Sequence, residues 1–182
     1  YLSSDGVPVV MISQQDGDWL KSKLSDTLSA QILPTSKKLI QTSSATIKLS
    51  QADFGVGIPK YLSAEAILVR DLWAPWSDAC DSIVNSSELQ GNIALIDKAN
   101  CYPDLQALHA QKAGAVAVVM MSDSDEYPSS LDNSSYGSLI QIPVMQVSAS
   151  DAAILMQHLN KPVSIENRLP PLLDGSFDAG II

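Results

Sequence analysis

Residues 91–121 place two short apolar runs on either side of a helix-like segment, and this pattern constrains the fold more than any other part of the chain. The first run, Asn92 to Ile96, lies between Gly91 and Asp97, and the second, residues 115–121, is rich in β-branched side chains. Such runs are typical of strands that are covered on both faces. We therefore expect two adjacent buried strands, and a helical crossover is the usual connection between such strands.

The segment between the two runs has the features of a helix over residues 103–113. Pro103 suits the first helical turn, and Leu105 and Leu108 are spaced to form a buried stripe. Gly114 follows at the position where a left-handed C-terminal cap is expected. The sequence therefore predicts a strand, a capped helix and a second strand in this order.

The same stretch resembles the core of a protease-associated (PA) domain, whose pattern runs G-x-I-A-L-I-D-R-G-x-C-x-F, then a helix ending A-Q-x-A-G-A, then a V-A-V-I strand. Lys98, Ala99 and Pro103 depart from that pattern, which puts contacts of this loop in doubt but not the fold. The resemblance covers residues 45–167 and implies a mixed α/β, swivelling β/β/α domain, with a small sheet flanked by helices at 103–113 and 149–159. The matching residues are Gly91, Ile93, Ala94, Leu95, Ile96, Asp97, Cys101, Ala110, Gln111, Ala113, Gly114, Ala115, Ala117 and Val118.

Composition excludes several classes of partner. The chain has 182 residues, a formal net charge of −9 and a pI near 4.4, so it lacks the basic surface that nucleic acid or an anionic membrane requires. We also expect no membrane span, because no apolar run approaches the length of one. The chain begins at Tyr1, and we expect it to be part of a longer protein.

The two cysteines, Cys80 and Cys101, leave two interpretations open. Secreted proteins that resemble this domain often carry one cysteine in a D-x-C segment before the first core strand and one after it. The resemblance therefore implies a disulfide, which would stabilise by about 3 kcal/mol and indicate a secreted or cell-surface location. The alternative is a pair of buried free thiols.

An internal repeat indicates how the chain is organised. Residues 7–24 align without gaps on residues 142–159, and both copies read as a strand, a Ser-x-x-Asp cap and a helix. We interpret residues 1–33 as the C-terminal part of a preceding PA domain, residues 34–44 as a linker and residues 45–167 as the intact domain. Convergence between similar strand–helix units is the alternative explanation.

Residues 168–182 form a C-terminal segment whose last part reads Asp174-Gly-Ser-Phe-Asp-Ala-Gly-Ile-Ile182. It resembles the lead-in to the HExxH helix of fungalysin-like zinc metallopeptidases, in which two histidines bind zinc and the glutamate acts as general base. The resemblance implies a zinc-dependent parent whose catalytic helix is absent from this sequence. A plain linker is the alternative.

No catalytic constellation is encoded in the sequence. His109 and His158 fall on different predicted helices, and neither belongs to a zinc motif. There is no G-x-S-x-G nucleophile motif. Residues 123–126 superficially resemble the start of a calcium loop, but the glycine at position six and the glutamate at position twelve of such a loop are missing. We therefore predict no catalytic, metal or cofactor residues in this chain, with zinc expected only in the parent.

Two loops are candidates for contact with a partner: the tryptophan loop before Cys80 and the polar loop 122–141. Exposed aromatic side chains serve as interaction anchors, although tryptophans more often cover the edge of a core. The candidate residues are Trp73, Trp76, Asp123, Asp125, Tyr127 and Tyr136.

We expect a non-catalytic module of a secreted zinc metallopeptidase that interacts with protein or peptide substrate or covers the active site, in contact with the adjacent peptidase domain. A structural spacer or adhesion-type domain of an extracellular protein is the alternative. An independent hydrolase is disfavoured because the motifs for it are missing.

Overall fold

The computed structural model describes residues 37–73, 77–97, 101–126, 131 and 135–168, together with residues 18, 21 and 22. The chain divides into two units, residues 1–33 and 34–182. The first copy of the repeat and the C-terminal segment therefore lie almost entirely outside the described residues, and their interpretation stays a prediction.

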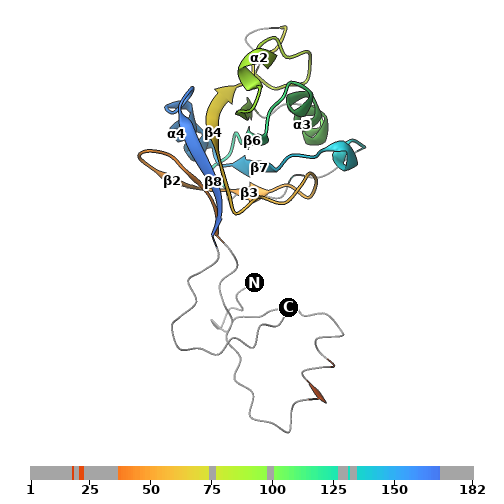
Figure 1. Cartoon of the computed structure of the whole chain (residues 1–182), viewed down its shortest axis with the longest axis vertical. Coiled ribbons are helices and arrows are strands. Elements are labelled where there is room, and N and C mark those ends of the chain that lie inside the picture. The colour runs from red at the N-terminus through yellow and green to blue at the C-terminus, as the bar shows by residue number, and fades with distance from the viewer. Residues whose placement is uncertain are drawn as a thin grey trace. The chain divides into compact units, whose positions relative to one another are not determined.

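The described part of the second unit is built on one eight-stranded sheet with the order β2-β1-β8-β4-β5-β6-β7-β3 (Figure 1). The strands are β1 (Lys37–Gln41), β2 (Thr46–Lys48), β3 (Ser50–Gln51), β4 (Tyr61–Leu68), β5 (Ile93–Asp97), β6 (Ala117–Met121), β7 (Val144–Val147) and β8 (Pro162–Arg168). The helices are α2 (Ser86–Leu89), α3 (Pro103–Lys112) and α4 (Ala149–Met156), with a 3₁₀ turn, η1, at Gly137–Leu139.

The predicted strand–helix–strand core is confirmed. β5 and β6 pair in parallel, with Ile93 opposite Ala117 and Asp97 opposite Met121, and α3 connects them. β4 and β7 extend this parallel group on its two sides. All five residues of β6 are buried, as its continuous apolar sequence requires.

The helix caps also follow from the sequence. Gly114 ends α3 with a φ of +94°, and the Ser148 side chain accepts a hydrogen bond from the backbone N–H of Asp151 at 3.2 Å. Both caps satisfy backbone groups that helix termini leave without an intrahelical partner.

Residues 34–44 are not only a linker, because β1 lies inside that range. Its residues pair antiparallel with β8, with Ile40 opposite Ile165, and with β2, with Ile40 opposite Ile47. Ile40 is fully buried. The sheet therefore begins at Lys37, before the boundary at residue 45, since β8 supplies backbone partners for this lysine-rich stretch.

The two outer strands of the sheet order are successive parts of one short stretch, residues 46–51. β2 pairs with β1 at one end of the sheet, and β3 pairs with β7 at the other. The sheet is therefore nearly closed into a barrel, which leaves little edge available for unwanted pairing.

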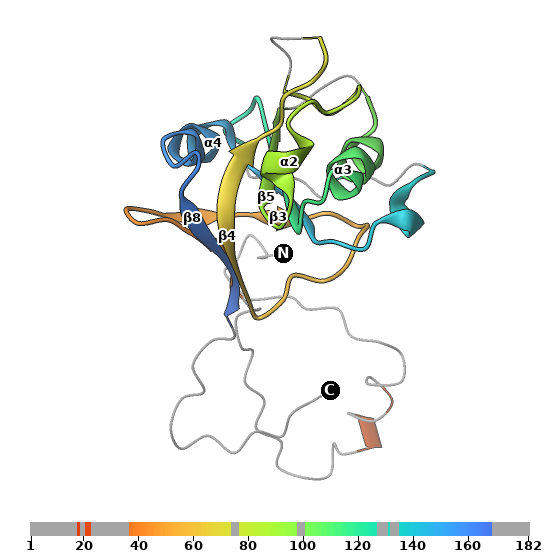
Figure 2. The same cartoon turned by 45° about the horizontal axis from the view of Figure 1, so that its top comes forward.

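Two apolar clusters cover the two faces of the central strands. One contains Leu95, Val119 and Leu155 of α4, and the other contains Ile96, Val118 and Leu108 of α3. Figure 2 shows α4 and α3 on either side of β5. This is the predicted mixed α/β architecture with two flanking helices.

Candidate functional site

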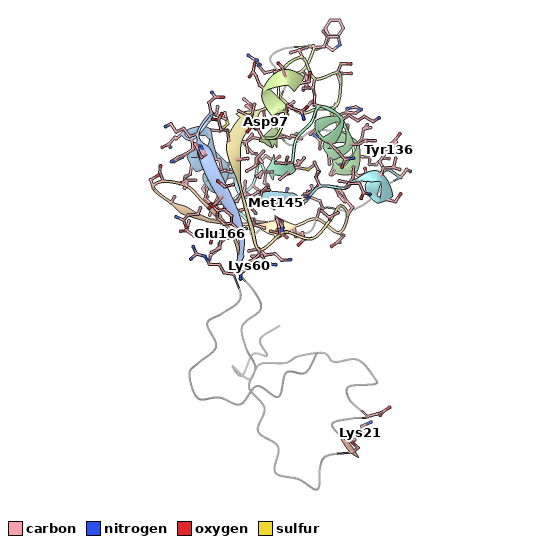
Figure 3. The ribbon with its side chains drawn as sticks, in the orientation of Figure 1. Lys21, Lys60, Asp97, Tyr136, Met145 and Glu166 are labelled. Carbon is pink, nitrogen blue, oxygen red and sulfur yellow. A yellow bond between two sulfur atoms is a disulfide. The ribbon has the colours of Figure 1, made fainter. Side chains whose placement is uncertain are left out.

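The carboxyl ends of the four parallel strands meet at one end of the domain. Figure 3 shows Asp97, the last residue of β5, at the opposite end from Lys60, which precedes β4. In α/β sheets, ligands bind beyond the carboxyl ends of parallel strands, where the connecting loops gather. The loops after β4, β5 and β6 therefore form the candidate site.

The loop after β4 forms a hairpin-like projection, residues 70–84, which we call the stapled hairpin. Asp71 and Ile83 form an antiparallel bridge. The N–H of Leu72 donates to Ser82 O at 3.0 Å, and the N–H of Val84 donates to Arg70 O at 2.9 Å. Residues 74–76, including Trp76, lie outside the described residues, so the stapled hairpin refers to residues 70–73 and 77–84.

Asp71 anchors this hairpin from inside. Its side chain is 4% exposed, and its Oδ2 accepts hydrogen bonds from the N–H groups of Asp78 at 2.8 Å and Ala79 at 3.0 Å. Its Oδ1 is buried without a hydrogen-bond partner among the described residues. Burial raises the pKa of the Asp71 carboxyl, and the charge of Asp78 acts in the same direction.

A disulfide joins Cys80 of the hairpin to Cys101 of the loop after β5, with a Cα–Cα distance of 5.9 Å. These are the two cysteines that the resemblance paired. Ala79 beside it is fully buried with a φ of +55°, a conformation that is unusual for a residue other than glycine. The carbonyl of Ala79 accepts a hydrogen bond from His109 Nδ1 of α3 at 2.8 Å. The disulfide thus joins the hairpin to the loop after β5, and the hydrogen bond from His109 joins it to α3.

The predicted interaction residues are spread over several elements. Trp73 is 67% exposed on the stapled hairpin. The N–H of Tyr136 donates to Asp104 Oδ2 of α3 at 2.8 Å, and Asp125 Oδ1 accepts from the N–H of Ser150 at 2.6 Å. Tyr127 and Trp76 lie outside the described residues. These hydrogen bonds join Tyr136 to α3 and Asp125 to the start of α4, and a shared role with Trp73 stays a prediction.

Asp123 lies at a shallow pocket of about 330 Å³ beside the ends of β5 and β6. Burial raises the pKa of Asp97 in this pocket, and the nearby charge of Asp78 adds to the rise. The lining residues are Asp97, Met121, Ser122, Asp123, Ala152, Ala153 and Met156.

The two histidines have structural contacts. His158 is 7% exposed, with Nδ1 2.9 Å from Ile154 O and Nε2 3.2 Å from Ser44 Oγ. His109 holds Ala79 and also borders a second pocket of about 280 Å³, which Lys112 and Asp81 line as well. The described residues contain no group of three His, Cys, Asp or Glu side chains that could hold a metal ion.

Sequence reasoning missed Leu72, Val84 and Asp71. Leu72 and Val84 are apolar yet 59% and 56% exposed, while the polar Asp71 between Leu72 and Arg70 is buried. Alternation of inward and outward positions in an extended hairpin is the signal that could have found them.

No helix in the described parts of the chain has the length and apolar character needed to cross a bilayer. A family model described as the PA domain matches residues 64–155, half of the chain. The chain belongs to the PA domain family. The match contains the stapled hairpin, both cysteines and the parallel core.

Solved structures with a similar fold include peptidases. A zinc aminopeptidase, BSAP, from Bacillus subtilis is 18% identical with a TM-score of 0.52, covering 75% of this chain and 33% of that chain. An aminopeptidase from Aneurinibacillus sp. strain AM-1 is 18% identical with a TM-score of 0.50, covering 76% of this chain and 31% of that chain. At such identities, these likenesses concern the fold of the PA domain.

A curated relative belongs to another class of protein. The ER degradation-enhancing alpha-mannosidase-like protein 3 of Xenopus laevis is 33% identical over 75 residues, which cover 41% of this chain and 8% of that protein. This chain therefore corresponds to a small part of the proteins that it matches.

Proposed function

We propose that this PA domain is a non-catalytic module that holds protein substrates for a secreted zinc metallopeptidase. The observation that carries the proposal is the stapled hairpin, which presents exposed Leu72 and Trp73 at the carboxyl end of the parallel strands. Exposed apolar residues on a fixed framework are typical of protein contact sites. The occurrence of the same fold in aminopeptidases supports this role.

Deleting residues 37–168 from the full-length parent tests the proposal. We expect kcat/KM to fall by at least about tenfold on a folded protein substrate and to change little on a short peptide, because only the protein substrate reaches from the catalytic centre to this module. An equal loss on both substrates would contradict substrate holding and would fit a cover over the active site, the other role open to such a module.

The parent class rests on the segment 174–182 and its resemblance to the lead-in of an HExxH helix. We propose that the parent carries a histidine–glutamate pair in the residues that follow Ile182. Determining that sequence tests the assignment directly, and a continuation without such a pair would exclude a fungalysin-like parent. The disulfide supports an oxidising, extracytoplasmic location.

A structural spacer is the second candidate, because a similar segment also occurs in a protein that is named as alpha-mannosidase-like and not as a peptidase. A spacer acts through its size alone. Replacing residues 37–168 with an unrelated domain of similar length would then restore full activity on folded substrate, whereas a substrate-holding module would not be replaceable.

A further inference from the structure

We propose that the outer face of the stapled hairpin docks a polypeptide segment in which apolar side chains are flanked by lysine or arginine. This inference rests on the proposed function, because it names the chemistry of the protein substrate that the module would hold. It follows from three properties of the hairpin: its exposed apolar face, its rigid attachment and the sign of the surrounding charges.

The apolar face follows from the pairing of the hairpin. Asp71 and Ile83 form the bridge and turn inward, as the burial of Asp71 and the packing of Ile83 on a core cluster indicate. The neighbouring positions in each arm, Leu72 and Val84, therefore turn outward on the same face. Trp73, the residue after Leu72, is also exposed.

The hairpin holds this face in place before any partner arrives. Two backbone hydrogen bonds join its arms, Asp71 caps the turn at Asp78 and Ala79, and the disulfide joins it to the loop after β5. A rigid surface loses little conformational entropy on binding, so more of the apolar contact energy appears as affinity.

Carboxylates predominate in the hairpin itself. Its described arms hold Asp78 and Asp81, which are at least partly exposed, and Asp71, which is buried. Lys112 of α3 lines a pocket with Asp81. Arg70 at the base of the hairpin is already paired with Glu88. Burial raises the pKa of Asp97, and the charge of Asp78 adds to the rise through repulsion between the two carboxylates. Lysine or arginine beside the bound apolar residues would reduce that repulsion.

The same charges select against other occupants. A second copy of this chain carries a net charge of −9 and would be repelled, as would an anionic lipid surface. A neutral glycan can donate hydroxyl hydrogen bonds to the carboxylates, but it carries no positive charge that would offset theirs. The basic and apolar polypeptide is therefore the occupant that the charge pattern favours.

Fluorescence anisotropy on the full 182-residue chain tests the proposal with two labelled peptides. Both have a leucine–valine–leucine centre, flanked by lysines in one and by glutamates in the other. We expect the lysine peptide to bind at least about tenfold more tightly, and its affinity to fall as salt increases. Equal affinities for the two peptides would overturn the proposal.

Variants locate the contact. The double variant Leu72→Ser with Val84→Ser should bind the lysine peptide about tenfold or more weakly than the wild type. Leu139 on η1 is 54% exposed, and the control variant Leu139→Ser should bind the peptide as the wild type does. Asp81→Asn should reduce the preference for lysine over glutamate, and Asp53→Asn on an exposed loop before β4 should leave it unchanged. Unchanged binding by the double variant, or dimerisation of the chain that competes with the peptide, would overturn the proposal.

The peptide-binding experiment and the deletion experiment test the docking inference and the proposed function separately. If the peptides fail to discriminate while deletion of the module still affects folded substrates selectively, the docking inference is wrong and the proposed function stands. If docking is found while deletion affects both substrates equally, the surface is real and the substrate-holding role is wrong.

Discussion

At the residue scale, Gly114 shows how one position fixes the join between α3 and β6. Its φ is +94°, and a Cβ there would lie 2.3 Å from Gln90 Oε1 and 3.2 Å from Gln90 Cα. The carbonyl oxygen of Gly114 also accepts a hydrogen bond from the N–H of Gly91 at 2.9 Å. Only glycine meets both the conformational and the spatial requirement.

Gly114→Ala should therefore lower the free energy of unfolding by about 2 kcal/mol, measured by urea denaturation. Gly57→Ala is the matched control, because its φ is not in the positive range and a Cβ there would meet no atom within 4 Å. Equal stability of the two variants would show that Gly114 is not constrained in this way.

Asp71 gives a prediction about pH. Burial raises the pKa of its carboxyl above the ordinary 3.8, so the folded state carries an unfavourable buried charge at neutral pH. Protonation removes that cost, and the wild type should gain stability relative to Asp71→Asn as the pH falls from neutral through the raised pKa toward 3.8. Asp97 also has a raised pKa, but it is present in both proteins.

Urea denaturation of both proteins over this pH range measures the effect. The asparagine retains an oxygen that accepts hydrogen bonds from the backbone N–H groups, so the comparison isolates the charge. A difference in stability that stays constant with pH would contradict the assignment to Asp71.

At the element scale, the stapled hairpin depends on its covalent link. Replacing Cys80 and Cys101 together by serine opens a loop with a sequence separation of 21 residues. We expect a loss of about 3 kcal/mol in the free energy of unfolding, since the reduced unfolded chain has more conformations to lose. Denaturation with and without reductant measures it. Reductant should bring the wild type to the level of the double variant, and no effect of reductant on the wild type would contradict a structural role.

Elements with local signals were predictable from the sequence, and elements with distant partners were not. The apolar runs and the caps at Gly114 and Ser148 located β5, α3, β6 and α4 to within a few residues. β1 was missed because it is short and begins with two lysines, and because one of its two partners, β8, lies more than a hundred residues away in the sequence. Pairing over such a distance leaves no local pattern.

The buried face of α3 shows the same limit. Leu108 is buried as expected, but Leu105 is only partly buried, and Asp104 and Gln106 are buried instead. Asp104 accepts from the N–H of Tyr136, and Gln106 donates to the carbonyl of Asp78. Polar residues can be buried when distant segments supply hydrogen-bond partners, which the spacing of apolar residues does not reveal.

The candidate site was predictable only in part. Trp73 and the cysteines were singled out from the sequence, whereas the outward positions of Leu72 and Val84 depend on the register that Asp71 and Ile83 set. Tyr136 and Asp125 belong to the second candidate loop, and the hydrogen bonds that join this loop to α3 and α4 are not visible in the sequence.

At the scale of the whole molecule, the nearly closed sheet is the framework from which the hairpin projects. β1 and β8 complete the sheet outside the family match at residues 64–155, and β2 and β3 join its two ends. The central claim is that the outer face of the hairpin holds protein substrates.

The most direct measurement is kcat/KM of the full-length parent carrying Leu72→Ser and Val84→Ser, on a folded protein substrate and on a short peptide. We predict a loss of about tenfold on the folded substrate and no change on the peptide, because the hairpin contacts only the larger substrate. Leu139→Ser should change neither value. Wild-type activity of the double variant on folded substrate, or an equal loss on both substrates, would contradict the account.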